Sequence, residues 1–175
     1  MEIKFFIEPI FKLEFFKIQC IDFENKREQI EKLFEQYPEI RLENFYSNRN
    51  KSNMSWELQE VFKDEFNLIT TKFNSKINLK KTWSVTYDKG DYHIAHNHGS
   101  LGYAGILYLR MKRGSPGTTY IQPWNNEKDQ SVLYSPNVEE GDIMIVPQFL
   151  THYTEPNKTY FKKKILSFDF ILKNP

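Results

Sequence analysis

The chain of 175 residues contains a single cysteine, Cys20, and no long hydrophobic run. One cysteine cannot form an internal disulfide, so the composition is typical of a reducing compartment. No apolar stretch approaches the roughly 20 residues of a membrane-spanning helix. Charged residues interrupt the aromatic N-terminus, which lacks the apolar core and the cleavage site of a signal peptide. We therefore predict a cytoplasmic protein with no membrane partner.

Net charge is also nearly absent. The 24 basic and 23 acidic residues leave a formal charge of +1, which gives no indication of nucleic-acid binding. Aromatic residues make up 16% of the chain and argue against disorder. The sequence has no internal repeat and no obvious linker. At this length we predict a single domain over residues 1–175, large enough to bury a core.

The first part of the chain, residues 1–78, is predicted to hold an N-terminal strand and helices. Apolar residues recur near the helical period from Phe23 to Tyr37, and Pro38 ends that pattern. A second helical pattern begins near the potential caps Ser52-Asn53 and continues toward Phe73.

From Leu79 onward the pattern changes to short strands. Trp83, Val85 and Tyr87 alternate with polar neighbours, as in a half-buried strand. The segment from Trp124 to Pro136 is predicted to be a long loop with a binding role. Helices followed by many strands favour a sandwich or barrel with helices on one face, and we place the β core at residues 79–171. Further strand-like runs are Gly102 to Met111, Thr118 to Gln122, Asp142 to Val146 and Lys164 to Ile171.

Histidine is scarce, yet three of the four histidines lie within six residues, in the stretch YHIAHNHG. Side chains two apart on a strand share a face, so His96 and His98 can point at one site. His152, on a later strand, can supply a third ligand. Neutral imidazole suits iron, zinc, copper and nickel, and three ligands leave coordination positions open. His93 has the opposite parity and is predicted to be a bystander. The alternative is that these are loop histidines and polar packing residues.

The segments around these histidines carry a resemblance. The stretch from Tyr87 to His98 resembles the Tyr-x-x-Gly…His-x-Asp segment of Fe(II)- and 2-oxoglutarate-dependent oxygenases of the prolyl hydroxylase type. Gly102 to Leu109 looks like the next strand of that family, and Gly117 to Tyr120 is similar to its Gly-Gly-x-Thr-x-Phe turn. Val138 to Pro147, followed by His152, matches its Gly-Asp…Phe-Pro…His segment. The likeness spans about half the chain and is greatest to bacteriophage-encoded members, which carry HNHG before a GYS-type strand.

The resemblance implies a mainly β fold with N-terminal helices and a double-stranded β-helix core, the jelly roll also seen in cupins. It also implies that His96, His98 and His152 hold Fe(II). The family places a carboxylate where this chain has His98, in keeping with the two-histidine, one-carboxylate triad of such iron sites. An acidic residue such as Asp91 is an alternative third ligand, and zinc and nickel are alternative metals.

2-Oxoglutarate is the co-substrate that the resemblance implies. In the family, a cation on the strand after the distal histidine binds its far carboxylate, and the lysine run at 162–164 offers Lys163 for this role. Ser167 then occupies the position of a hydroxyl partner on the same strand face. Tyr108 matches a tyrosine that hydrogen-bonds the same carboxylate, and Tyr87 matches one that lines the pocket. The alternatives are a solvated turn for the lysines and ordinary strand packing for the tyrosines.

The activity that follows from the resemblance is dioxygenase chemistry. O2 and 2-oxoglutarate would be consumed, giving succinate and CO2, while a C–H bond of an organic substrate is hydroxylated. No protein side chain is assigned as catalytic, and the substrate class stays open among a peptide side chain, a nucleobase and a small metabolite. Two other functions stay open: a cupin-like three-histidine metalloenzyme that does not use 2-oxoglutarate, and a non-catalytic jelly-roll binding module. If the chain is phage-encoded, its compartment is the host cytoplasm.

Overall fold

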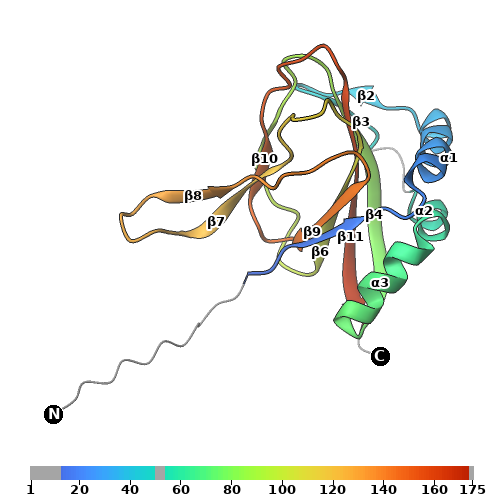
Figure 1. Ribbon diagram of the computed structural model, residues 1–175, viewed down its shortest axis with the longest axis horizontal. Coiled ribbons are helices and arrows are strands. Elements are labelled where there is room, and N and C mark those ends of the chain that lie inside the picture. The colour runs from blue at the N-terminus through green and yellow to red at the C-terminus, as the bar shows by residue number, and fades with distance from the viewer. Residues whose placement is uncertain (1–12, 50–53, 174–175) are drawn as a thin grey trace.

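The computed structural model describes residues 13–49 and 54–173, which form two antiparallel sheets and three helices (Figure 1). The larger sheet has seven strands in the order β1 (Phe16–Gln19), β9 (Asp142–Pro147), β6 (Tyr103–Arg110), β11 (Lys163–Lys173), β4 (Lys76–Tyr87), β3 (Tyr46–Ser47) and β2 (Ile40–Arg41). The smaller sheet has four strands in the order β5 (His93–His96), β10 (His152–Thr154), β7 (Thr119–Asn125) and β8 (Ser131–Tyr134).

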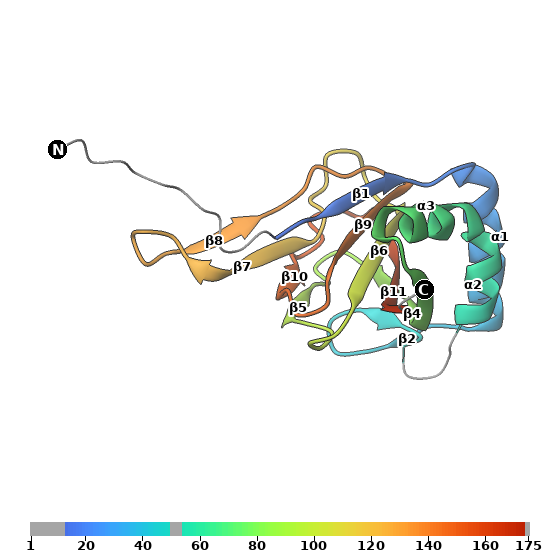
Figure 2. The same cartoon turned by 90° about the horizontal axis from the view of Figure 1, so that it is seen from below.

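The helices cover one face of the larger sheet, as Figure 2 shows from below. Helix α1 (Phe23–Gln36) agrees with the sequence pattern. The second predicted helix is in fact two, α2 (Ser55–Val61) and α3 (Lys63–Phe73). Phe62 separates them with φ −102° and ψ 25°, although its side chain is buried and keeps the apolar period intact. The predicted caps at 52–53 lie outside the described residues. None of the three helices is both long and apolar enough to cross a membrane.

The central strands of the larger sheet are buried on both faces, so they read as nearly continuous apolar runs. Alternate residues of β6 and β11 point to opposite sides. On the helix side, the ring of Phe168 lies over Gly105, where a Cβ atom would come within 2.0 Å of it. The opposite side faces the smaller sheet and packs around an aromatic and aliphatic cluster that includes Trp83, Val85, Tyr87, Ile106, Tyr108, Met144 and Ile165.

The predicted loop after Trp124 is instead a β-hairpin. Strands β7 and β8 pair from Tyr120 to Asn125 and project away from the rest of the molecule (Figure 1). The side-chain oxygen of Asn126 accepts hydrogen bonds from the backbone N–H groups of Lys128 and Gln130, at 2.9 and 3.0 Å. These bonds close a tight turn between the two strands, so the segment is more regular than its polar sequence indicates.

Candidate metal centre

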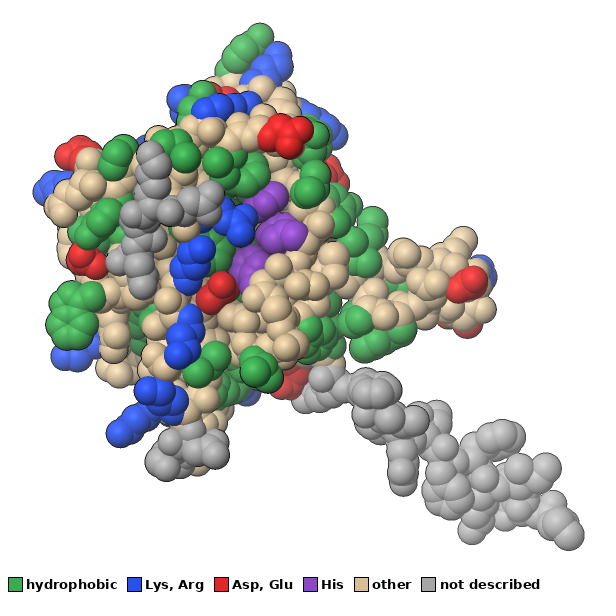
Figure 3. Space-filling view, turned by 180° about the vertical axis from the view of Figure 1, so that it is seen from behind, with side chains coloured by type: hydrophobic (Ala, Val, Ile, Leu, Met, Phe, Trp, Pro, Cys, Tyr) green, Lys and Arg blue, Asp and Glu red, His purple; other side chains and the backbone are tan. Residues whose placement is uncertain are grey.

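His96, His98 and His152 come together where the smaller sheet faces the larger one. Antiparallel pairing of β5 with β10 sets His96 directly opposite His152. His98 follows the end of β5, and its backbone N–H donates to the carbonyl oxygen of Gln148 at 3.0 Å. One side-chain nitrogen from each of the three histidines lies within 4.8 Å of the other two. Figure 3 shows histidine side chains in a hollow of the surface, next to basic side chains.

The hydrogen bonds of the three rings orient one nitrogen of each toward the common site. Nδ1 of His96 is 2.9 Å from the carbonyl oxygen of Ile94, and Nδ1 of His152 is 2.9 Å from that of Leu150. A carbonyl only accepts, so each Nδ1 carries the proton and each Nε2 keeps its electron pair. Nδ1 of His98 is held in the same way by Asp169 Oδ1 at 2.6 Å. This is the arrangement that orients metal-binding imidazoles in proteins.

Burial keeps His96 and His152 neutral. His152 is 4% exposed, and desolvation lowers its pKa from the usual 6.5 to about 3. Desolvation also lowers the pKa of His96, although its bond to the Ile94 carbonyl acts in the opposite direction. A protonated imidazole cannot bind a metal ion, so both residues are in the ligand form at neutral pH. The donor set therefore fits a divalent metal ion such as iron, zinc or nickel.

His93 lies on the same side as His96, contrary to the prediction from strand parity. Its ring stacks on the His96 ring with centroids 4.0 Å apart, and it lines the same cavity. The reason is an irregularity in the pairing with β10: His96 is opposite His152, whereas His93 is opposite Thr154. The four residues His93–His96 of β5 thus lie opposite the three residues His152–Thr154 of β10, and the extra residue puts His93 and His96 on the same side. The group of converging ligand atoms does not include His93.

The acidic residue at the site is Asp169, which sequence reasoning missed. Asp91, the alternative ligand considered from sequence, instead binds the guanidinium of Arg41 through both carboxylate oxygens, at 2.6 and 2.8 Å. Asp169 comes from β11, 71 residues after His98. A signal was present in the sequence, because Asp169 is the one acidic residue of β11 and lies between two buried aromatic residues.

Arg49 is a second residue that the sequence did not indicate. It precedes α2 and lines the histidine cavity together with residues of both sheets, including Trp83, Thr118, Thr154 and Ser167. The free space between these side chains is about 20 Å³. That is enough for one ion or water molecule. Arg49 therefore places a positive charge beside the histidines of a compact site.

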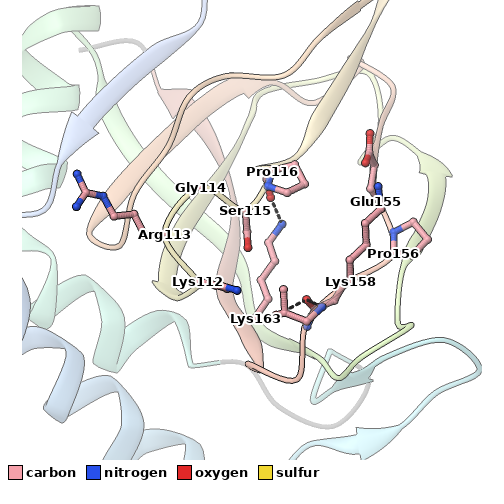
Figure 4. A pocket seen from close by; sticks show the side chains of 11 residues that line it. Lys112, Arg113, Gly114, Ser115, Pro116, Glu155, Pro156, Lys158 and Lys163 are labelled. Atoms are coloured by element: carbon pink, nitrogen blue, oxygen red, sulfur yellow. Dashed lines mark hydrogen bonds between the residues drawn. The ribbon is translucent and has the colours of Figure 1, made fainter.

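Lys163 is buried at the start of β11, with 6% of its surface exposed. Its Nζ donates to the carbonyl oxygens of Pro116 and Gly117, at 2.9 and 3.3 Å. It also forms part of the wall of a neighbouring cavity of about 320 Å³, where Figure 4 shows it reaching toward Pro116. Burial lowers the pKa of Lys163 from 10.5 to about 8. The adjacent lysines differ: Lys162 pairs with Asp88 at the surface, and Lys164 lies over the Phe34 ring on the helix side.

The other residues predicted to hold a co-substrate also lie in the interior. Tyr87 and Ser167 both line the histidine cavity and are 1% and 4% exposed. Tyr108 is fully buried, and its hydroxyl oxygen accepts the backbone N–H of Thr118 at 2.9 Å, which leaves the hydroxyl proton available to donate. The Nζ atom of Lys163 is 5.9 Å from the Tyr87 ring centroid and 5.7 Å from that of Tyr108. These side chains therefore connect Lys163 with the histidine cavity.

Comparison with solved structures identifies the same fold in Fe(II)- and 2-oxoglutarate-dependent oxygenases. An oxidoreductase of the 2OG-Fe(II) oxygenase family from Burkholderia pseudomallei matches with a TM-score of 0.67 and 10% identity, over 90% of this chain and 85% of that one. HygX from Streptomyces hygroscopicus, solved with nickel, 2-oxoglutarate and hygromycin B, matches with a TM-score of 0.63 and 13% sequence identity. The match covers 90% of this chain and 82% of HygX.

A viral collagen prolyl hydroxylase from Paramecium bursaria Chlorella virus-1, in its 2OG complex, matches with a TM-score of 0.62 and 14% sequence identity. The match covers 89% of this chain and 94% of the hydroxylase. No protein-family model and no curated protein matches the sequence. At identities this low, the structural matches establish the fold alone. They confirm the predicted double-stranded β-helix with added helices. The likeness to phage-encoded members stays a prediction.

Replacement of His96 or His152 by alanine is expected to abolish tight binding of a divalent metal without unfolding the chain, because each loss leaves only two imidazole ligands. His93→Ala is the matched control and should keep the parental stoichiometry, since its ring stacks on His96 without joining the ligand group. Stoichiometry can be measured by equilibrium dialysis against Co(II) with metal analysis, and folding by circular dichroism. Full occupancy in both the His96→Ala and His152→Ala variants would contradict the assignment.

Proposed function

We propose that the chain is an Fe(II)- and 2-oxoglutarate-dependent dioxygenase that hydroxylates a C–H bond of an organic substrate. The observation that carries the proposal is the convergence of His96, His98 and His152 between the two sheets of a fold shared with such oxygenases. Bound iron would supply the redox chemistry that couples decarboxylation of 2-oxoglutarate by O2 to oxidation of the substrate. The presence of nickel and 2-oxoglutarate in HygX supports the same pairing of metal and co-substrate here.

The chain's own contribution at the metal is orientation and charge. Three imidazoles, each fixed through Nδ1, would hold the ion and leave coordination positions free for 2-oxoglutarate and O2. Part of the wall is aromatic and aliphatic, with Trp83 tilted against His98 at 5.3 Å between ring centroids and Ile106 and Ile165 nearby. Such walls exclude water and hold the ligand rings in place.

Lys163 is the residue assigned to the far carboxylate of 2-oxoglutarate. Its buried ammonium donates to two carbonyl oxygens and has no carboxylate partner within 4.0 Å among residues 13–49 and 54–173. Glu155 lines the same neighbouring cavity but is not within contact distance, so an incoming carboxylate would compensate the buried charge more directly. Tyr108 can add a hydroxyl donor to the same anion, and Ser167 and Tyr87 line the path toward the histidines.

The compact histidine cavity requires some movement when 2-oxoglutarate binds. A space of about 20 Å³ accommodates a single ion, so side chains that line it must shift to admit a five-carbon diacid. Arg49 is suited to this, because it belongs to the connection that precedes α2 and not to a strand of either sheet. We assign to Arg49 the rim of the cavity, where it would meet the substrate or the co-substrate as they enter.

The three-histidine donor set favours a second candidate, a cupin-like metalloenzyme that does not use 2-oxoglutarate. The two candidates share the metal site and differ in what Lys163 does. In the cupin alternative, Lys163 is a structural residue that ties β11 to the loop carrying Pro116 and Gly117. Binding of 2-oxoglutarate by the metal-loaded protein therefore distinguishes them.

Lys163→Ala should raise the dissociation constant for 2-oxoglutarate about 30-fold or more, because loss of a buried charge-assisted pair costs roughly 2–5 kcal/mol. Calorimetric titration of the Ni(II)-loaded protein measures this without turnover. Lys162→Ala and Lys164→Ala are the matched controls and should bind like the parent, since Lys162 pairs with Asp88 at the surface and Lys164 lies on the helix side of the sheet. Metal affinity should not change in any of the three.

Two results of that titration would redirect the proposal. If Lys163→Ala binds 2-oxoglutarate like the parent while Arg49→Ala does not, the carboxylate is held by the cation at the rim. If the metal-loaded parent does not bind 2-oxoglutarate, the cupin alternative replaces the oxygenase.

The affinity for 2-oxoglutarate should also fall as the pH rises above 8. Burial lowers the pKa of Lys163 to about 8, so the ammonium is charged below that pH and loses its charge above it. A bound carboxylate favours the charged form and moves the transition upward. We expect the dissociation constant to increase between pH 7 and 10 in the parent and to stay flat over that range in Lys163→Arg, because arginine remains charged. The same rise in both proteins would assign the pH dependence to another group.

A further inference from the structure

The three histidines differ in what holds their second nitrogen. Nδ1 of His96 and Nδ1 of His152 each face a backbone carbonyl, a neutral acceptor. Nδ1 of His98 faces the carboxylate of Asp169 at 2.6 Å, a short contact of the charge-assisted kind. The side chains of His98 and Asp169 are 8% and 17% exposed, so water screens the pair only weakly. His98, which occupies the position of the usual carboxylate ligand, is therefore the histidine whose Nδ1 contacts a carboxylate.

The packing and pairing of β11 fix the position of Asp169. Asp169 shares a strand face with Ser167, which lines the histidine cavity, and the neighbouring Phe168 and Phe170 are buried in the core beneath the helices. The pairing of β11 with β4 shifts register directly after Asp169. Irregularities of this kind redirect side chains next to functional sites. Trp83 packs against the His98 ring from β4, so the imidazole is held from two sides.

The charge of the metal site depends on this contact. A two-histidine, one-carboxylate triad gives an iron(II) site one negative protein ligand, whereas three neutral imidazoles give none. A carboxylate that accepts the Nδ1 proton makes the imidazole a more basic ligand and brings negative charge close to the metal. We propose that Asp169 acts through His98 to supply the negative charge that a ligating carboxylate would otherwise contribute. This inference rests on the proposed metal site, and Asp169 is a positioning residue, not a ligand.

Asparagine and alanine substitutions separate the charge of Asp169 from its geometry. In Asp169→Asn, the amide oxygen can still accept the Nδ1 proton, so the ring keeps its orientation but loses the charge behind it. Asp169→Ala removes both. Asp88→Asn is the matched control, because Asp88 pairs with Lys162 at the surface.

The experiment measures Co(II) affinity by competition with a chelating indicator, together with the visible spectrum of the bound Co(II). We expect Asp169→Asn to weaken Co(II) binding about 10- to 100-fold and to shift the ligand-field bands, since loss of such an outer partner has effects of this size. Asp169→Ala should lose at least as much, and Asp88→Asn should stay within about twofold. Parental affinity and spectrum in Asp169→Asn would overturn the charge role and leave the three-histidine site intact. Failure of the parent to bind Co(II) would overturn the metal site itself.

A double-mutant cycle tests whether the effect passes through His98. In a His98→Asp background, the charge sits on the ligand itself, and Asp169 becomes a second carboxylate beside it. Asp169→Asn should then leave Co(II) affinity unchanged or increase it. The effect of Asp169→Asn would thus differ between the two backgrounds, so the two substitutions would not be additive. Equal weakening by Asp169→Asn in both backgrounds would contradict transmission through the imidazole, because it would show a through-space effect independent of residue 98.

Discussion

The pairing of β5 with β10 is the constraint on which the site depends. It brings His96 and His152, far apart in the sequence, directly opposite one another. Because strand side chains alternate between faces, a slip of one residue in β10 would turn His152 away from the cavity. The irregularity between His152 and Thr154 adds His93 to the same side and gives the cavity an imidazole-rich wall. The local register of two short strands thus determines the chemistry that the fold can hold.

The larger sheet supports that register from the other side. Strand β11 lies between β4 and β6, and its outer face is fixed under the helices by residues such as Leu166 and Phe168. Its inner face carries Lys163 near one end and Asp169 six residues later. Packing against the helices therefore determines where a buried cation and a carboxylate stand relative to the histidines. The helices contribute to function in this way without supplying a residue to the site.

Charge is distributed unevenly across the interior. Burial favours the neutral form of His96 and His152. Lys163 is a cation without a carboxylate within contact distance in the described part of the chain, and Asp169 is held against His98. These charges match the chemistry of a diacid that chelates a metal ion, because one end of such a molecule needs the metal and the other needs a cation. A buried lysine whose Nζ contacts only carbonyl oxygens costs stability unless an opposite charge compensates it.

Much of the fold and part of the site could be predicted from the sequence. The long strands were visible because apolar and aromatic residues mark them, and the histidine pattern indicated His96, His98 and His152. Short strands such as β5 and β10 have too few residues for a periodic signal, and the pairing irregularity that reverses His93 involves two strands at once.

Asp169 and Arg49 escaped prediction for a different reason. Neither residue lies near the histidines in the sequence, and only the tertiary fold brings them to the cavity. Asp91 was the nearer acidic residue, but the fold pairs it with Arg41. Spacing along the chain can indicate which residues a local segment presents, whereas the charge that surrounds a site depends on contacts between distant strands.

The most direct test of the account is anaerobic titration of the protein with Fe(II) and then with 2-oxoglutarate, followed by visible absorption. We expect a charge-transfer band that appears only when both are present and saturates at one iron per chain, because 2-oxoglutarate would chelate an ion held by His96, His98 and His152. Iron binding with no band on addition of 2-oxoglutarate would contradict the oxygenase assignment, and an absence of iron binding would contradict the metal centre.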